Sequence, residues 1–209
     1  IASGGFAQLS GTYTINGGSA TGGTNYQTFP AAMSALGSQG VNGPVTFNVI
    51  EGTYTGQVNM PSSISGTSTT NTETFQGDAS NSNNPVLSNS GYVLYFYNTN
   101  LNNITFRDLE MNSTASRTVY LYNYYNTSYP NINIVFEDCQ IEAGTSSSAY
   151  CPVYLYPYYY GSPTDFTFDG CEIIGGYYGI YFYPYYNQSS ILKLTVNDCE
   201  IKDFNYMGL

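Results

Sequence analysis

Four short segments in the second half of the chain carry tyrosine at alternate positions. They read Leu-Tyr-Phe-Tyr-Asn from Leu94, Val-Tyr-Leu-Tyr-Asn from Val119, Val-Tyr-Leu-Tyr-Pro from Val153 and Ile-Tyr-Phe-Tyr-Pro from Ile180. Alternate residues of a β-strand point to the same face of a sheet, so both tyrosines of each segment would share the outer face. Aliphatic and phenylalanine side chains would then fill the core. An exposed group of aromatic side chains is typical of a contact surface.

Three roles are open for this surface. Flat aromatic faces suit the C–H faces of sugar rings, and tyrosine hydroxyls can bond to sugar hydroxyls. A second protein, or another copy of the chain, would also fit, because tyrosine is enriched at protein interfaces. Alternatively, aligned tyrosines only stabilise the sheet, by roughly 0.2–1 kcal/mol for each cross-strand pair. The candidate glycan- or partner-binding residues are Tyr95, Tyr97, Tyr120, Tyr122, Tyr154, Tyr156, Tyr181 and Tyr183.

Acidic side chains recur at fixed offsets and would form two outward columns. One column reads Glu110, Gln140, Glu172 and Glu200, and the other reads Arg107, Glu137, Asp169 and Asn197. Stacked carboxylates could bind calcium through oxygen ligands or supply the paired acids of a glycosidase, roughly 5–9.5 Å apart. The simplest interpretation is a solvated surface with an ion pair between Arg107 and Glu137. We predict no cofactor, with calcium only weakly indicated.

The composition excludes several classes of function. The 209 residues include 4 Lys+Arg, 14 Asp+Glu and no His, for a net charge of −10. So few cations cannot form a face that binds nucleic acid or an anionic membrane surface. The absence of histidine excludes every imidazole-based mechanism, and no apolar run approaches the roughly 20 residues of a membrane span.

An internal repeat indicates the fold that positions these residues. Four segments align at offsets of 30, 32 and 28 residues, and they are Ile104–Met111, Ile134–Ile141, Phe166–Ile173 and Leu194–Ile201. Their alternation has the period of strands, and no helix separates them from the tyrosine segments. A repeat of about 30 residues made only of strands and turns predicts a parallel β-solenoid. Equivalent residues would then stack at about 4.8 Å from coil to coil.

Two columns of the repeat support this interpretation. One contains Asp108, Asp138, Gly170 and Asp198, and an exchange of aspartate for glycine predicts a left-handed backbone at a bend. The next contains Leu109, Cys139, Cys171 and Cys199, which predicts an inward ladder of free thiols. Cys151 lies outside this ladder, and its redox state stays open.

The first half is less regular and contains one expected helix, from Thr28 to Leu36. Thr28 is the predicted N-cap, Pro30 lies in the first turn, and Gly37 follows the end. This helix would cover the open N-terminal end of the solenoid. Strands are expected at 45–50 and 56–60, and polar loops at 62–72 and 77–85.

The ends of the chain suggest processing. Residues 1–7 resemble the remnant of a signal peptide, which implies export, and residues 8–209 form a single expected domain. Residues 204–209 repeat the approach to a tyrosine segment that does not follow. We therefore expect this chain to be cut from a longer protein.

The chain resembles secreted right-handed parallel β-helix proteins of the pectate-lyase-like superfamily. It is most similar to surface proteins of Bacteroidota that are exported through the type IX system. The resemblance is carried by residues 11–16, 26–40 and 43–54 and by the repeated coils, and it covers nearly the whole chain. It implies an all-β, right-handed parallel β-helix with a short N-terminal capping helix, and an extracellular or cell-surface location.

The resemblance says little about activity, because this fold carries both enzymes and inert stalks. Lyases of the superfamily use Lys or Arg as a base, usually beside calcium, and polygalacturonase-like members carry a histidine motif that is absent here. The only candidate bases lie in different columns, and they are Arg107, Arg117, Lys193 and Lys202. We therefore expect an adhesin or binding module for a glycan, with no nucleic acid partner and no membrane insertion. A polysaccharide lyase or glycoside hydrolase, and a structural stalk or self-assembling filament subunit, are the alternatives.

Overall fold

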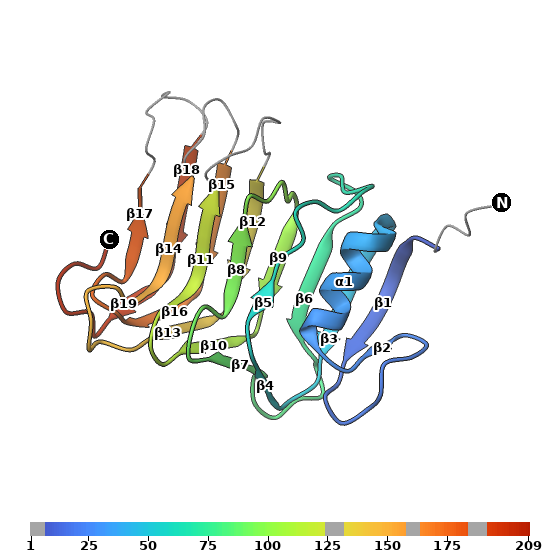
Figure 1. The fold of residues 1–209 in the computed structure, drawn as a ribbon, viewed down its shortest axis with the longest axis horizontal. Helices are drawn as coiled ribbons and strands as arrows, with labels where there is room; N and C mark the ends of the chain where they lie inside the picture. The colour runs from blue at the N-terminus through green and yellow to red at the C-terminus, as the bar shows by residue number, and fades with distance from the viewer. Residues whose placement is uncertain (1–6, 124–131, 158–163, 184–191) are drawn as a thin grey trace.

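The chain winds as a right-handed parallel β-helix, as the repeat predicts (Figure 1). The computed structural model describes residues 7–123, 132–157, 164–183 and 192–209. Three parallel sheets run along the solenoid axis, and successive coils place one strand in each of them. Among the described residues, no helix has the length and hydropathy that a membrane span requires.

The strands divide among three sheets. Sheet A contains β1 (Leu9–Ile15), β2 (Asn25–Tyr26), β3 (Val41–Val49), β6 (Glu73–Gly77), β9 (Ile104–Arg107), β12 (Ile132–Glu137), β15 (Thr164–Asp169) and β18 (Leu192–Asn197). Sheet B contains β4 (Thr53–Thr55), β7 (Val86–Asn89), β10 (Glu110–Ser113), β13 (Gln140–Ala143), β16 (Glu172–Gly175) and β19 (Glu200–Lys202). Sheet C contains β5 (Val58–Asn59), β8 (Leu94–Tyr97), β11 (Arg117–Asn123), β14 (Cys151–Pro157) and β17 (Ile180–Phe182).

The coils pair in the register that the repeat predicts. In sheet A, Ile134 lies opposite Ile104 on one side and opposite Phe166 on the other. In-register pairing places equivalent side chains directly above one another. Wholly buried phenylalanines therefore form a continuous core column, which consists of Phe47, Phe75, Phe106, Phe136 and Phe168. Their ring centroids lie 4.7–5.4 Å apart with interplanar angles of 4–16°.

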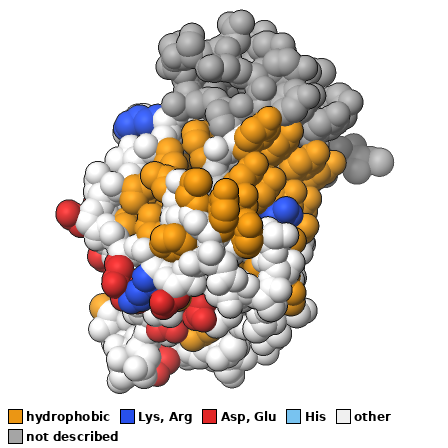
Figure 2. All heavy atoms as spheres, turned by 90° about the vertical axis from the view of Figure 1, so that its left-hand side faces the viewer, with side chains coloured by type: hydrophobic (Ala, Val, Ile, Leu, Met, Phe, Trp, Pro, Cys, Tyr) orange, Lys and Arg blue, Asp and Glu red, His pale blue; other side chains and the backbone are white. Residues whose placement is uncertain are grey.

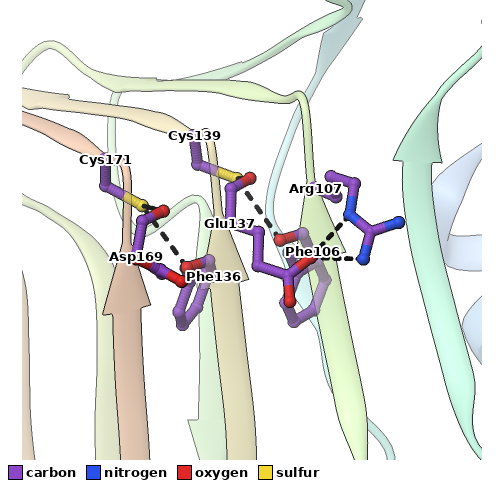
Figure 3. Close-up of polar contacts among 7 residues, drawn as sticks. All are labelled: Phe106, Arg107, Phe136, Glu137, Cys139, Asp169 and Cys171. Carbon is purple, nitrogen blue, oxygen red and sulfur yellow. Dashed lines mark hydrogen bonds and ion pairs between the residues drawn. The ribbon is translucent and has the colours of Figure 1, made fainter. Parts of the chain in front are cut away.

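The bend between sheets A and B has the predicted left-handed backbone. The φ angles are 52° at Asp108, 51° at Asp138, 65° at Gly170 and 48° at Asp198. The residue after each bend points inward, and the three cysteines of this column are free thiols. Cys139 and Cys171 are buried, and each Sγ–H donates to a backbone carbonyl of the preceding coil, at 3.5 Å from Phe106 O and Phe136 O respectively (Figure 3).

Cys151 is also a buried free thiol, on β14. Its Sγ–H donates to the carbonyl of Val153 at 2.9 Å. Burial raises the pKa of this thiol to about 12, so it stays protonated.

The expected helix is α1 (Phe29–Gln39), and its N-terminus is as predicted. The Oγ1 of Thr28 accepts a hydrogen bond from the Ala31 N–H at 3.3 Å, and Pro30 lies in the first turn. The prediction that Gly37 follows the helix end is wrong. The helix continues to Gln39 and ends at Gly40, whose φ is 67° and whose N–H donates to Leu36 O.

Gly37 instead allows the chain near Pro61 to pack closely against helix α1. A Cβ there would lie 3.1 Å from Cβ of Pro61, so glycine lets the chain after β5 pass tightly against the helix. Phe29, Met33 and Leu36 are buried, and α1 contacts β5, the edge strand of sheet C, together with β1 and β2. The helix thus covers the N-terminal end of sheet C, while β2 is the edge of sheet A (Figure 1).

The first coils differ in detail from the prediction. The strand expected at 45–50 is β3, which already begins at Val41, and the strand expected at 56–60 is reduced to the two residues of β5. Strands β1, β2, β4, β6 and β7 were not predicted, because they carry neither the tyrosine pattern nor the repeated aspartate bend. The residues expected as a polar loop at 62–72 do lie outside the strands, whereas the loop expected at 77–85 begins one residue later, because Gly77 is the last residue of β6.

Glu73 on β6 is an anomaly in the core. It lies in register between Val45 and Ile104, and its side chain is 0% exposed. Both carboxyl oxygens are buried and have no hydrogen-bond partner. Burial raises the pKa of this carboxyl to about 8, since ionisation inside an apolar core is costly.

The raised pKa makes stability depend on pH. The folded state holds the Glu73 proton more tightly than the unfolded chain, so the free energy of unfolding falls as pH rises from about 4.5 to about 8. The slope is at most about 1.4 kcal/mol per pH unit. We expect Glu73→Ile to stabilise the protein, and by more at pH 8 than at pH 5, in urea unfolding. An equal gain at both pH values would contradict a buried, unpaired carboxyl.

The bend column allows a second stability test, at Asp138. Asp138→Ala places a less tolerant residue in the left-handed region and should lower the free energy of unfolding by about 1 kcal/mol. Asp138→Gly is the matched control, because glycine occupies the equivalent bend at residue 170 and adopts positive φ freely. Thermal unfolding of both variants measures the difference. An alanine variant as stable as the glycine variant would show that the bend carries no strain.

Candidate binding surface on sheet C

The eight predicted site residues form two adjacent columns on sheet C. The first column consists of Tyr95, Tyr120, Tyr154 and Tyr181, which pair in register across β8, β11, β14 and β17. The second column consists of Tyr97, Tyr122, Tyr156 and Tyr183. We call these eight residues the tyrosine face.

The alternation of the strands directs these tyrosines outward. Leu94, Val119 and Leu121 are buried in the core, as are their equivalents in the other coils except Phe182, which is partly buried. The intervening tyrosines are half-buried or exposed, and Tyr97 and Tyr183 reach 51% and 44% exposure. The prediction of an aromatic outer surface over four coils is therefore confirmed in its geometry.

The rings of the second column stack on one another. The centroid distances along it are 6.2, 5.3 and 5.6 Å, with interplanar angles of 8–15°. In the first column, Tyr95 and Tyr120 lie 5.4 Å apart at 20°, and Tyr154 and Tyr181 lie 4.7 Å apart at 15°. The ring faces are thus turned toward neighbouring coils, so the surface presents ring edges and hydroxyls. This differs from the flat stacking surface that the sequence suggested.

Five phenolic hydroxyls of the tyrosine face are available as hydrogen-bonding groups. Within the described part of the chain, no hydrogen bond involves the hydroxyls of Tyr95, Tyr97, Tyr120, Tyr154 or Tyr181. Burial raises the pKa values of Tyr95, Tyr120 and Tyr154 above that of free tyrosine. These groups therefore stay neutral near pH 7, and each can both donate and accept.

Arg117 adjoins the first column, a position that the sequence did not single out for binding. Its guanidinium carbon lies 4.7 Å from the ring centroid of Tyr120 and 4.0 Å from that of Tyr154. These two rings meet at 75°, unlike the stacked pairs on either side of them. A cation over aromatic faces is a favourable arrangement.

Further tyrosines extend the surface. Tyr92 contacts Tyr95 and Tyr120 at centroid distances of 5.2 and 4.5 Å, and Tyr178 contacts Tyr181 at 5.1 Å. The sequence pattern missed both, because they precede the alternating segments. The sequence places further tyrosines directly after the alternating segments, where they would widen the face. These residues lie outside the described part of the chain, and they are Tyr124, Tyr125, Tyr158, Tyr159, Tyr160, Tyr185 and Tyr186.

The charged columns lie on sheets A and B and stack in register, and the predicted pair of Arg107 with Glu137 is present. Arg107 forms an ion pair with Glu137, with its Nε donating at 2.6 Å (Figure 3). Lys202 Nζ lies 2.9 Å from carboxylates of both Glu172 and Glu200. In the end-on view of the stack, acidic side chains gather toward the lower left, and hydrophobic side chains gather across the middle and right of the described surface (Figure 2).

These ion pairs are poorly suited to catalysis. A lysine base needs a lowered pKa, but hydrogen bonds to the two glutamates raise the pKa of Lys202. A general acid needs a raised pKa, yet the hydrogen bond from Lys202 lowers that of Glu200. Among the described residues, no group of three or more acidic or cysteine side chains is arranged to hold a metal ion.

The structural contribution of the tyrosine columns can be measured at Tyr120. Its ring contacts Tyr92, Tyr95, Tyr154 and Arg117, so Tyr120→Ala should lower the free energy of unfolding by about 1–3 kcal/mol. Tyr120→Phe keeps the ring and should stay within about 0.5 kcal/mol of wild type. Urea unfolding followed by circular dichroism compares the two. Equal stability of both variants would mean that the stacked rings do not support the sheet.

Comparison of the chain with protein-family models, with curated proteins and with solved structures finds no match. The parallel β-helix is established by the pairing of the coils alone. The surface chemistry of sheet C is the basis for a proposed function.

Proposed function

We propose that this chain is a binding module that holds an extended polysaccharide along the tyrosine face. The observation that carries the proposal is the double column of outward tyrosine hydroxyls, repeated in register over four coils. Sugars offer hydroxyls at regular intervals, and phenolic hydroxyls can donate to and accept from them. A surface of ring edges and hydroxyls therefore favours hydrogen bonding to sugars over stacking on them.

The spacing favours a polymer that lies parallel to the solenoid axis. Neighbouring rings of a column are 4.7–6.2 Å apart, which is close to the advance of an extended β-1,4-linked chain per sugar unit. Each coil would then meet one sugar. Individual contacts between neutral hydroxyls are weak in water, but linked contacts along one polymer reinforce one another.

The setting that we propose is extracellular, with the chain acting as an adhesin or a secreted binding module. The low proportion of charged residues, 9%, is consistent with export. Kinship with pectate-lyase-like proteins, and with exported surface proteins of Bacteroidota, is part of this proposal. It is supported by the parallel β-helix and its N-terminal helix.

Self-association through the same face is the second candidate. Tyr97 and Tyr183 are exposed, and tyrosine is enriched at interfaces between proteins. Sedimentation of the purified chain separates the two cases, because an interface between copies gives a concentration-dependent mass without any sugar.

Affinity electrophoresis through gels cast with a panel of neutral and acidic polysaccharides tests the proposal. We expect one polymer to retard the wild-type chain. A quadruple variant with phenylalanine at Tyr95, Tyr97, Tyr120 and Tyr154 keeps the rings and removes four hydroxyls. This variant should lose the retardation while keeping the melting temperature within a few degrees of wild type.

Tyr26→Phe, at the N-terminal end and away from sheet C, is the control and should bind like wild type. A quadruple variant that still binds, while the corresponding alanine variant does not, would indicate ring stacking rather than hydroxyl recognition. Absence of retardation by every polymer would refute glycan binding by this chain. New chain ends in a retained polymer, lost in Glu172→Gln, would instead establish an enzyme.

A further inference from the structure

The charges of the molecule are segregated away from sheet C. None of the 14 acidic residues lies in a strand of this sheet, and Arg117 is the one charged residue in its strands. In a chain of net charge −10, the tyrosine face is therefore free of carboxylates and carries a single cation.

Arg117 is also the exception among the four cations. Arg107 is paired with Glu137, Lys193 with Asp165 at 3.5 Å, and Lys202 with two glutamates. Within the described residues, no carboxylate lies in ion-pair distance of Arg117, and its Nε is buried without a hydrogen-bond partner. A guanidinium offers five N–H donors, so this group has unused capacity beside the ligand surface.

The neighbouring rings hold the guanidinium in place. The first column is stacked at 20° between Tyr95 and Tyr120 and at 15° between Tyr154 and Tyr181, but Tyr120 and Tyr154 meet at 75°. The break in the stack coincides with the position where Arg117 lies 4.7 and 4.0 Å from these two ring centroids. A side chain that is already ordered loses less conformational entropy when it binds a ligand.

We propose that Arg117 is the subsite for an oxyanion carried by the polysaccharide, either a carboxylate or a sulfate ester. This inference rests on the proposed function and names the class of ligand, an acidic rather than a neutral polymer. Guanidinium forms charge-assisted hydrogen bonds with planar or tetrahedral oxyanions, and these are stronger than neutral ones. The absence of carboxylates on sheet C removes the nearest source of repulsion for such a ligand.

Three soluble cellulose derivatives with one shared backbone test the inference. Hydroxyethyl cellulose is neutral, carboxymethyl cellulose carries carboxylates, and cellulose sulfate carries sulfate esters. The dissociation constant of the chain for each immobilised polymer is measured by biolayer interferometry. We expect tighter binding to one acidic derivative than to the neutral one. Arg117→Gln should weaken that binding about tenfold and leave binding to hydroxyethyl cellulose unchanged.

Two further variants control for the change in net charge and for the geometry of the hydrogen-bond donors. Arg107→Gln makes the same change of net charge away from sheet C and should bind like wild type. Arg117→Lys keeps the charge without the planar donor pair, and binding between that of Arg117→Gln and wild type is expected. Melting temperatures establish that each variant is folded.

The outcomes separate the inference from the proposed function. Equal affinity of the wild type for neutral and acidic derivatives would overturn the Arg117 subsite and leave glycan binding intact. A loss in Arg107→Gln as large as that in Arg117→Gln would also overturn it, because net charge alone would explain the preference. No binding to any of the three polymers, together with no retardation by any polymer of the electrophoresis panel, would overturn both.

Discussion

In-register parallel pairing of successive coils is the constraint on which the rest of this structure depends. Each strand pairs with its equivalent in the next coil, so a residue type that recurs in the sequence becomes a column in space. Phenylalanine columns fill the core, aspartate or glycine columns make the bends, and tyrosine columns cover sheet C. Because the coils repeat at the spacing of strands, aromatic side chains in one column must lie within stacking distance of each other. The sheet geometry therefore dictates where the candidate ligand groups lie and brings their rings within contact distance of one another.

The orientation of the tyrosine rings determines which groups sheet C offers to a partner. Rings that pack face to face along the axis stabilise the sheet, so the structural and binding roles of the tyrosines share the same side chains. What the surface offers to a partner is hydroxyls and ring edges, with Arg117 at the one break in the first column. The charged residues on sheets A and B are mostly paired among themselves, which is consistent with a solvated surface of modest energetic value. Function is thus best sought on sheet C.

Much of the fold was predictable because the repeat encodes it. The offsets between the aspartate bends, and the alternation in the tyrosine segments, were sufficient for the register, the left-handed bends, the buried cysteines and the outward tyrosines. The helix start at Thr28 was predictable from local capping chemistry, whereas its end was not, because Gly37 is required by the close approach of Pro61. The burial of Glu73 could not be predicted, because the neighbouring residues in the sequence do not indicate that a glutamate occupies a core column. Ring orientation and the position of Arg117 depend on side-chain packing between coils, which a sequence pattern does not specify.

Hydroxyl-radical footprinting of the chain, with and without a polysaccharide that it retains, tests the central claim most directly. Tyrosine is readily oxidised, and mass spectrometry assigns the protection of individual residues. Bound polymer should protect tyrosines of both columns across all four coils, together with Arg117, and leave sheets A and B unprotected. Protection confined to a single coil, or centred on the acidic columns of sheets A and B, would contradict a polymer lying along the tyrosine face.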